Sequence, residues 1–454
     1  MIPASATVNS RRPGSSRCMY KINLTNFRCF AELPRPLEVL PITFLVGENS
    51  SGKTTFLAGL RQLINGFAEA TSGNPFNSDP YFLGGFDQIA HYRGGKPGRA
   101  KQFSLEVTIP TGGENRPSTS HKYTFEKGTV KPELSEYVFD SPEAKLTLDL
   151  ANKFSVLKIE PKDGSVSFRN SEEKGAPPSA LLRNSVGVLR YIFESTFLRA
   201  DYIQAKERQA ELVALMKNLQ KRYKQSIDYT IRTTFATAPV RTQPLRTYTP
   251  SEIDASSEGA HVPLEMARSK FNPEEWRGVH DDLSQFGRHS GLFDDINIRR
   301  LGKNDGDPFQ VLVRTNGPAF NLVDVGYGVS QALPIIYQLQ HGKPRDAFLL
   351  QQPEVHLHPR AQAELGTLVA QLSKKRPNSL YAIETHSDYI IDRVRTEIAK
   401  GALNHKAVTI LFFQKGRHGL EAFNIYLSEK GEILDPPDNF RSFFLEEHAR
   451  LLGI

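Results

Sequence analysis

Apolar and polar positions follow distinct patterns along the chain, and together they predict a mixed α/β protein. Short, mostly apolar runs at 42–46, 347–350 and 380–383 are typical of strands buried on both faces. Alternation of apolar and polar residues at 20–24 and 103–109 indicates strands with one buried face. The run at 42–46 is followed by apolar residues at helical spacing, namely Phe56, Leu60, Leu63, Ile64 and Phe67.

Similar patterns continue over the rest of the chain. We expect further strands at 122–125, 154–159, 165–168, 309–314, 320–325, 408–413 and 422–427, with turns at Asp163-Gly164 and Asn316-Gly317. We expect helices at 274–286 and 360–372, after Ser330, and at the end of the chain before Leu452. Residues 68–100 and 238–262 are predicted to be loops, because glycine or proline recurs in them.

A polar helical pattern separates two groups of strands and predicts four regions. From about 178 to 229 a narrow apolar stripe lies among charged residues, and its members are Leu212, Leu215, Met216 and Leu219. Residues 1–18 are rich in Ser, Pro and Arg, and we expect a disordered N-terminal tail there. We therefore predict a first lobe at 19–177, a helical insertion and connector at 178–305, and a second lobe at 306–454.

The composition is that of a globular protein. Of 454 residues, 39% are hydrophobic and 24% are charged, so the chain can bury a large core. No apolar run approaches the ~20 residues of a membrane-spanning helix, and we expect a cytoplasmic protein without membrane contact. Cys18 and Cys29 are too few for a disulfide framework. The net charge of +7 favours acidic partners only in a general way.

A glycine-rich stretch after the strand at 42–46 matches a complete phosphate-binding loop. Its candidate nucleotide-binding residues are Gly47, Glu48, Asn49, Ser50, Ser51, Gly52, Lys53, Thr54 and Thr55. The glycines let backbone N–H groups point at phosphate oxygens, and the following helix adds its positive dipole end. Lys53 is placed for the β- and γ-phosphates and Thr54 for Mg²⁺. Because strand, loop and helix follow in the required order, we favour a nucleotide site over a turn that binds nothing.

A second glycine-containing element precedes another predicted helix. It reads Asp324-Val325-Gly326-Tyr327-Gly328-Val329-Ser330, in which two glycines free the backbone and the serine is a good N-cap. Such a helix N-terminus suits an anion, although an ordinary loop-to-helix cap explains the residues equally well. Two further runs follow two buried strands, and they read Gln351-Gln352-Pro353-Glu354-Val355-His356-Leu357-His358-Pro359 and Glu384-Thr385-His386-Ser387-Asp388.

Together these segments resemble the ATP-binding-cassette ATPases of the SMC, RecF and OLD (overcoming lysogenization defect) group. The P-loop, the Gly-x-Gly-x-Ser-Gln element, the Pro-Glu-x-His-Leu-His-Pro run and the Thr-His-Ser run occur in the group's order, and the resemblance extends from Tyr20 to Leu452. It implies an α/β fold, with an ABC-type P-loop ATPase head, mixed β-sheet lobes and an inserted helical arm. It also implies ATP and Mg²⁺ as cofactors, with nucleotide held between two copies of the chain.

The resemblance implies roles at a contact between two copies. The signature element, which contains Gly328, Ser330 and Gln331, would contact the γ-phosphate bound by the opposing copy. Residues 356–359 would form the D-loop between subunits. His386 would be the switch residue beside the γ-phosphate. ATP would therefore drive the pairing of two heads.

The same resemblance implies roles within one copy and reveals a departure. Arg28 would lie near the nucleotide, and Gln88 would be the loop glutamine that senses metal and water. The group's Mg²⁺-holding acid falls on Gln351 and its catalytic glutamate on Gln352. Glutamine lacks the anionic oxygen that orients a metal-bound water or accepts its proton. We expect slow hydrolysis, with Glu354 as a partial substitute, whether the first glutamine is natural or a replaced glutamate.

Two other kinds of chemistry fit the sequence less well. His356, His358 and His386 suggest a zinc site, but no cysteine or fourth ligand is spaced to complete it. No serine, histidine and acid are arranged as a convincing hydrolase triad. We therefore keep the nucleotide site as the main hypothesis.

The purpose of the ATPase is open to three interpretations. About 70 residues follow His386, too few for the nuclease domain of OLD-type proteins, so we expect a separate effector nuclease. The chain is most similar to the stand-alone ATPase subunit of anti-phage systems of the PARIS type, which holds and releases a toxic nuclease. One alternative is a DNA-repair or chromosome-maintenance ATPase that clamps DNA with Lys206, Arg208, Lys217, Lys221, Arg222 and Lys224. The other is an ATP-binding structural scaffold with little hydrolysis.

Overall fold

The computed structural model describes most of the chain. The described residues are 19–65, 74–96, 98–110, 118–151, 156–163, 168–169, 209–228, 231–250, 256–304, 306–416, 419–440 and 450. Several predictions lie outside them: the tail at 1–18, Phe67, Gly164 of one turn, the insertion before residue 209 with Lys206 and Arg208, and the helix before Leu452.

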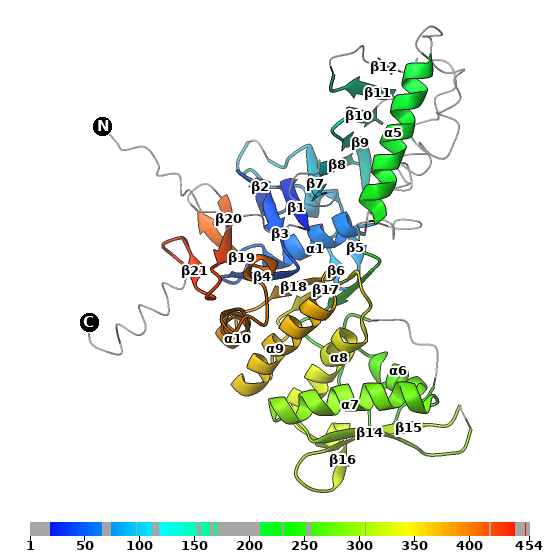
Figure 1. Ribbon diagram of the computed structural model, residues 1–454. Helices are drawn as coiled ribbons and strands as arrows, with labels where there is room; N and C mark the ends of the chain where they lie inside the picture. Colours follow the sequence, from blue (N-terminus) through cyan, green and yellow to red (C-terminus); the bar gives the residue numbers. More distant parts are fainter. Residues whose placement is uncertain are drawn as a thin grey trace.

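A nine-stranded antiparallel sheet forms one layer of the molecule (Figure 1). Its order is β12-β11-β10-β9-β8-β7-β1-β2, and β3 pairs with β1. The strands are β1 (Tyr20–Phe27), β2 (Phe30–Glu32), β3 (Leu37–Val39), β7 (Gln102–Pro110), β8 (Ser118–Lys127), β9 (Pro132–Asp140), β10 (Ala144–Asp149), β11 (Val156–Pro161) and β12 (Phe168–Arg169). The strands predicted at 20–24, 103–109 and 122–125 are confirmed. Strands β9 and β10 were not predicted. The burial of β9 does not alternate strictly, whereas β10 alternates strictly and the sequence analysis missed it.

The second sheet contains the strand before the P-loop and combines both halves of the chain. Its order is β13-β17-β18-β4-β19-β20-β21. The strands are β4 (Ile42–Gly47), β13 (Thr233–Thr237), β17 (Asp346–Gln351), β18 (Leu380–Glu384), β19 (Val408–Gly416), β20 (Gly419–Leu427) and β21 (Ile433–Leu434). The first five in this order are parallel to their neighbours. Because parallel strands end at one edge, the loops after β4, β17 and β18 meet there.

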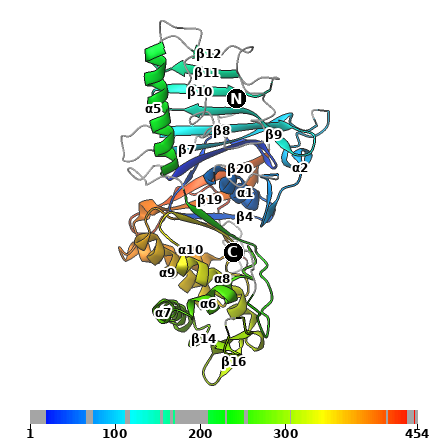
Figure 2. The same cartoon turned by 90° about the vertical axis from the view of Figure 1, so that its right-hand side faces the viewer.

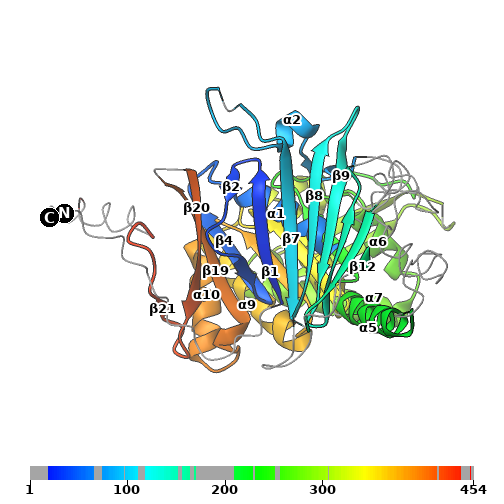
Figure 3. The ribbon, with the colours of Figure 1, turned by 90° about the horizontal axis from the view of Figure 1, so that it is seen from above.

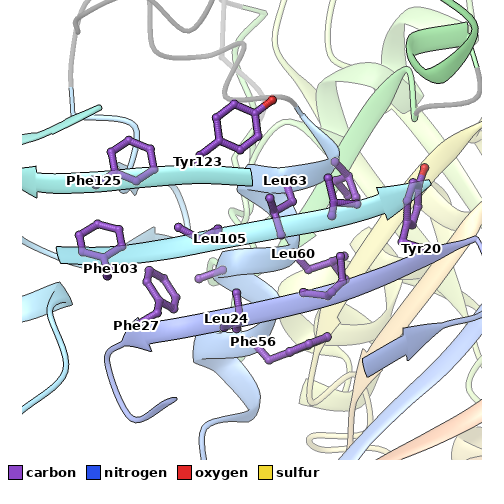
Figure 4. Close-up of a cluster of buried hydrophobic side chains, with 14 of the residues drawn as sticks. Tyr20, Leu24, Phe27, Phe56, Leu60, Leu63, Phe103, Leu105, Tyr123 and Phe125 are labelled. Atoms are coloured by element: carbon purple, nitrogen blue, oxygen red, sulfur yellow. The ribbon is translucent and has the colours of Figure 1, made fainter. Parts of the chain in front are cut away.

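Helices cover both faces of this second sheet. Alternation along β4 directs Leu45 toward the core shared with helix α1 (Lys53–Ile64) and the first sheet, and Phe44 toward the opposite core. Figure 4 shows the first core, where Phe56 and Leu60 of α1 lie against side chains of β1 and β7. The opposite core contains residues of α8 (Tyr327–His341), α9 (Pro359–Lys375) and α10 (Asp388–Ala399). Figure 3 shows the strands of the first sheet running past α1.

Smaller elements extend the two ends of the molecule. Helix α5 (Gln209–Asp228) packs beside the first sheet through the buried Met216 and Leu219 (Figure 2). The opposite end contains α6 (Val262–Ser269), α7 (Pro273–Ser290), β14 (Asp295–Arg300), β15 (Phe309–Arg314), β16 (Ala319–Asn321) and the 3₁₀ turn η4 (Leu322–Asp324). A second 3₁₀ turn, η5 (His405–Ala407), precedes β19. None of the described helices is both long and apolar enough to cross a bilayer.

Three predicted boundaries need correction. The predicted loop at 68–100 contains β5 (Asn77–Ser78), β6 (Tyr81–Phe82) and the short helix α2 (Phe86–Ile89). The second strand of the predicted 309–325 hairpin ends at Asn321, where its side chain caps η4. Ser330 is not an N-cap, because α8 already begins at Tyr327 and Gly326 is its cap. The serine hydroxyl donates instead to the carbonyl oxygen of Tyr327 at 3.0 Å, a side-chain-to-backbone bond within the first turn of α8.

Candidate nucleotide-binding site

The loop between β4 and α1 has a backbone that requires glycine. Gly47 has φ = 141° and Gly52 has φ = 92°, a region that favours glycine. A Cβ atom on Gly47 would lie 2.1 Å from the carbonyl oxygen of Phe413, so the loop follows the end of β19 closely. The loop therefore has the tight turn that lets successive N–H groups face a phosphate.

Lys53 and Thr54 begin helix α1 and face different partners. The Lys53 ammonium donates to the carbonyl oxygens of Gly47 at 2.9 Å and Glu48 at 2.7 Å. Burial lowers the pKa of Lys53, and the charges of Glu384 and Glu48 oppose that effect. The Thr54 hydroxyl donates to the carboxylate of Glu384 at 2.9 Å. The ammonium thus lies against the loop, where phosphate oxygens could replace the two carbonyl oxygens as its hydrogen-bond acceptors.

A cavity of about 440 Å³ opens beside this loop. Its wall consists of Arg28, Cys29, Ser50, Ser51, Gly52, Lys53, Thr54, Thr55, Gln88, Ala90, Tyr92, Arg99 and Glu384. The structure therefore brings Arg28 and Gln88 to the same cavity as the P-loop residues. Their two segments are joined, since the N–H of Arg28 donates to the carbonyl oxygen of Ile89 at 2.6 Å. The Gln88 side-chain oxygen accepts from the N–H of Gly85 at 2.8 Å, which caps the start of α2.

Glu384 is a site residue that the sequence analysis did not single out. It ends β18, the strand between β17 and β4, and it is only 5% exposed. Burial raises the pKa of Glu384, whereas the Thr54 hydroxyl and the Lys53 charge lower it. The sequence analysis quoted Glu384 as the first residue of the run at 384–388 but gave it no role. Its role depends on strand order, which a single sequence does not reveal.

Gln351 and Gln352 end the neighbouring strand. Gln351 is buried, and its N–H donates to the hydroxyl of Thr237 on β13 at 3.2 Å. Gln352 has φ = 42°, an uncommon value for a residue with a side chain, and its N–H donates to the carbonyl oxygen of Glu384 at 2.8 Å. Both glutamines are absent from the wall of the cavity. The predicted metal-holding position is therefore one strand farther from the P-loop than Glu384.

A buried arginine supports these strand ends through hydrogen bonds to their backbone. Arg241, in the predicted connector, donates from Nη2 to the carbonyl oxygens of Gln351 and Gln352, each at 3.3 Å. Burial lowers the pKa of Arg241 to about 10, and the charge of Glu354 opposes that effect. The Glu354 carboxylate accepts from the N–H of His386 at 2.7 Å, and its burial raises its pKa. The predicted catalytic acid and switch histidine are thus hydrogen-bonded to each other through the backbone.

The signature element and the D-loop lie together on another part of the surface. The rings of Tyr327 and His356 have centroids 5.7 Å apart, and both side chains are exposed. A Cβ atom on Gly328 would lie 2.8 Å from the carbonyl oxygen of His356, so glycine permits this approach. Ser330 and Gln331 are buried in α8. The predicted residues therefore form three groups: one at the cavity, one at the ends of β17 and β18, and one around the pair of rings.

The residues at the cavity fit a nucleotide with Mg²⁺. The loop presents N–H groups, the wall carries Arg28 and Lys53, and the Thr54 hydroxyl lies next to a carboxylate. Phosphate oxygens need N–H donors and positive charge, and Mg²⁺ needs oxygen ligands. Arg28, Lys53 and the loop would hold the phosphates. Thr54 would hold the metal, which neutralises phosphate charge when bound.

Comparisons with known proteins agree with this site at the level of the domain. The protein-family model described as "AAA domain" matches residues 21–229. The model described as "AAA domain, putative AbiEii toxin, Type IV TA system" matches residues 240–392. No curated protein matches the sequence. The two matches support an ABC-like P-loop ATPase, the group that the motifs predict.

The comparison with solved structures matches this chain to SMC head domains over most of its length. An Smc head domain with a coiled coil and joint from Pyrococcus yayanosii is 9% identical with a TM-score of 0.41, over 95% of this chain and 99% of that one. An Smc head bound to the C-terminal domain of ScpA, from Pyrococcus furiosus, is 8% identical with a TM-score of 0.40, over 95% and 98%. The SMC head domain from Thermotoga maritima is 11% identical with a TM-score of 0.33, over 90% and 100%. These identities are too low to carry residue roles from one protein to another.

Proposed function

We propose that this chain binds ATP and Mg²⁺ at the P-loop cavity, and that the bound nucleotide pairs two copies. The observation that carries the proposal is that two of the groups of predicted residues lie on separate parts of the surface. The cavity group includes Lys53 and Thr54, and the second group includes Tyr327 and His356 on an exposed surface. One group can hold a triphosphate and the other can cover it in a neighbouring copy. Binding of ATP in the cavity would then create a contact between two subunits.

We propose further that hydrolysis is slow. Glutamines occupy both positions where the resemblance implies acids, and neither amide can accept a proton from water. Glu354 is the acid closest to them in the sequence, but its carboxylate already accepts from the backbone of His386. The ATP-bound pair would therefore persist, a property suited to a switch rather than to rapid turnover.

The pairing proposal can be tested with three variants. Sedimentation velocity with MgATP should show a mass twice that of the free chain, and Lys53→Ala should lose both ATP binding and pairing. Tyr327 of the signature element is 53% exposed, and Tyr327→Arg places a charge there. This variant should bind ATP but remain monomeric. Val130→Arg adds the same charge to the exposed turn between β8 and β9 and should pair normally. Pairing by Tyr327→Arg would contradict the proposed interface.

The pairing is proposed to control a separate effector nuclease in anti-phage defence. The family description that matches residues 240–392 names a toxin of a type IV toxin–antitoxin system, which favours a role of this kind. A small nuclease encoded beside this chain would be the first candidate effector. Copurification of that nuclease with the ATP-bound pair, and its release after the Lys53→Ala change, is the expected result. A nuclease that never associates with either form would contradict effector control.

A DNA clamp is the second candidate, and one surface favours it. Lys217, Lys221 and Lys224 are exposed on α5 at helical spacing that places them on one side. Arg222, by contrast, is paired with Glu143 at 2.7 Å. A clamp requires ATP-dependent DNA binding that weakens steeply with salt, because lysines displace counterions from phosphates. Strong binding of this kind by the isolated chain would favour the clamp over effector control.

A further inference from the structure

Strand register places a carboxylate beside the position where the resemblance implies the metal-holding acid. In the parallel pairing of β17 and β18, the partner of Gln351 is Glu384. Strand β18 is also the neighbour of β4, so it is one strand closer to the P-loop. A carboxylate at the end of β18 therefore reaches the level of Gln351 from the side of the nucleotide.

The distance between Glu384 and Thr54 suits a shared divalent cation. Their oxygens are 2.9 Å apart. Mg²⁺ holds oxygen ligands at about 2.0–2.1 Å in an octahedron, so two adjacent ligands lie about 2.9 Å from each other. The two oxygens could accept the ion without moving apart. Thr54 is also the residue whose hydroxyl the P-loop pattern assigns to the metal.

One acidic residue among the described residues of the cavity wall is available to bind Mg²⁺. Among the described residues that line it, Arg28, Lys53 and Arg99 are basic, and Glu384 is the one acid. Gln351 carries no charge, and its carbonyl oxygen accepts from the guanidinium of Arg241. A divalent cation among these positive groups needs an anionic ligand from the protein or the phosphates.

We infer that Glu384, together with Thr54, holds the Mg²⁺ of the nucleotide in this chain and takes the place of the acid missing at Gln351. The inference rests on the proposed ATP site. It assigns the carboxylate to the carboxyl end of β18 rather than β17. Glu384 is then a metal ligand, and the neighbouring glutamine is a neutral residue of the strand end.

The inference predicts a specific loss in Glu384→Gln. The variant keeps the shape of the side chain but removes its charge. ATP affinity measured with a fluorescent analogue in EDTA should stay equal or become tighter, because a negative charge near the phosphates has gone. The gain in affinity that Mg²⁺ produces should fall at least tenfold. Glu429→Gln, on an exposed turn, should keep the full gain.

The outcomes distinguish this inference from the proposed function. No ATP binding by the unchanged chain, with or without Mg²⁺, would overturn the proposed function itself. ATP binding with the same Mg²⁺ gain in Glu384→Gln would overturn only the role of Glu384. A purely structural role would weaken both affinities alike, which also contradicts the inference.

A second measurement needs no variant. Carbodiimide labelling of carboxylates, read by mass spectrometry, can be compared for the unchanged chain with ATP in EDTA and with ATP in Mg²⁺. Labelling of Glu384 should slow at least severalfold when Mg²⁺ is present, whereas labelling of Glu429 should not change. Equal labelling of Glu384 in the two conditions would overturn the inference.

Discussion

Arg246 and Asp324 form a bidentate ion pair, with nitrogen-to-oxygen distances of 2.8 and 2.5 Å. Arg246 belongs to the connector between β13 and α6, and Asp324 opens the signature element. Both side chains are exposed, and such pairs contribute little to folding. The pair does neutralise a carboxylate on the surface that we propose meets the partner's triphosphate.

Arg246→Ala should therefore weaken pairing without weakening the fold. The freed charge of Asp324 would repel the phosphates of the opposing copy, so the pair should form only at higher protein concentration. Sedimentation velocity with MgATP measures this shift, and thermal melting should show no change. Adding Asp324→Asn should restore pairing. A double variant that pairs as poorly as Arg246→Ala would show that charge is not the cause.

Two nearby glycines provide a matched test of the contact between the signature element and the D-loop. A Cβ atom on Gly328 would meet the carbonyl oxygen of His356 at 2.8 Å, whereas one on Gly326 would meet nothing within 4 Å. Overpacking of this kind costs about 1–3 kcal/mol when the backbone must shift. Gly328→Ala should lower the free energy of unfolding by that amount and weaken ATP-driven pairing. Gly326→Ala replaces the cap residue of α8, so it should lower the free energy of unfolding by less, at most about 1 kcal/mol, and leave pairing unchanged. Equal effects of the two changes would contradict the contact.

A buried histidine predicts how the first sheet responds to acid. His121 of β8 lies under α5, where Nδ1 is 2.8 Å from the Tyr137 hydroxyl and Nε2 is 3.2 Å from the Ser226 hydroxyl. Ser226 donates to the carbonyl oxygen of Tyr223, so its oxygen accepts from Nε2–H and Nδ1 accepts from Tyr137. The neutral ring satisfies this arrangement. Burial lowers the pKa of His121 to about 4.

The sign of the pH effect follows from that lowered pKa. Between pH ~6.5 and pH ~4 the unfolded chain binds a proton at His121 that the folded chain does not, so stability falls as the pH falls. The full loss is about 3 kcal/mol at pH values below both pKa values. Urea unfolding at several pH values should show a smaller loss for His121→Asn than for the unchanged chain. The same loss in both would contradict the assignment, and His405→Asn serves as the control.

The P-loop could be predicted from sequence because its signals are local. The apolar run, the glycines and the apolar helical face all lie within a few residues of one another, and β4 and α1 appear where they were expected. The buried strands at 347–350 and 380–383 are confirmed for the same reason. Their continuous apolar residues reflect burial on both faces of a parallel sheet.

Glu384 and Arg241 could not be predicted as neighbours of the site, because their positions depend on distant pairings. Glu384 reaches Thr54 only because β18 lies between β17 and β4. Arg241 lies in a segment whose prolines predicted a loop, and no local pattern indicates that it supports the end of β17. The predicted division at residue 305 likewise could not indicate that β4 and β18 share one sheet.

Gln351→Glu tests the assignment of slow hydrolysis to the missing acids. Proton-transfer groups typically change rates by about 10²–10⁴-fold. If a carboxylate at position 351 orients the metal-bound water, the variant should turn over ATP faster, by up to roughly 100-fold. If Glu384 already holds the metal, the added carboxylate should also leave the Mg²⁺ gain in ATP affinity nearly unchanged. Single-turnover assays with Gln310→Glu on β15 as a matched control separate these effects. Equal rates for the unchanged chain and Gln351→Glu would show that the glutamine does not limit hydrolysis.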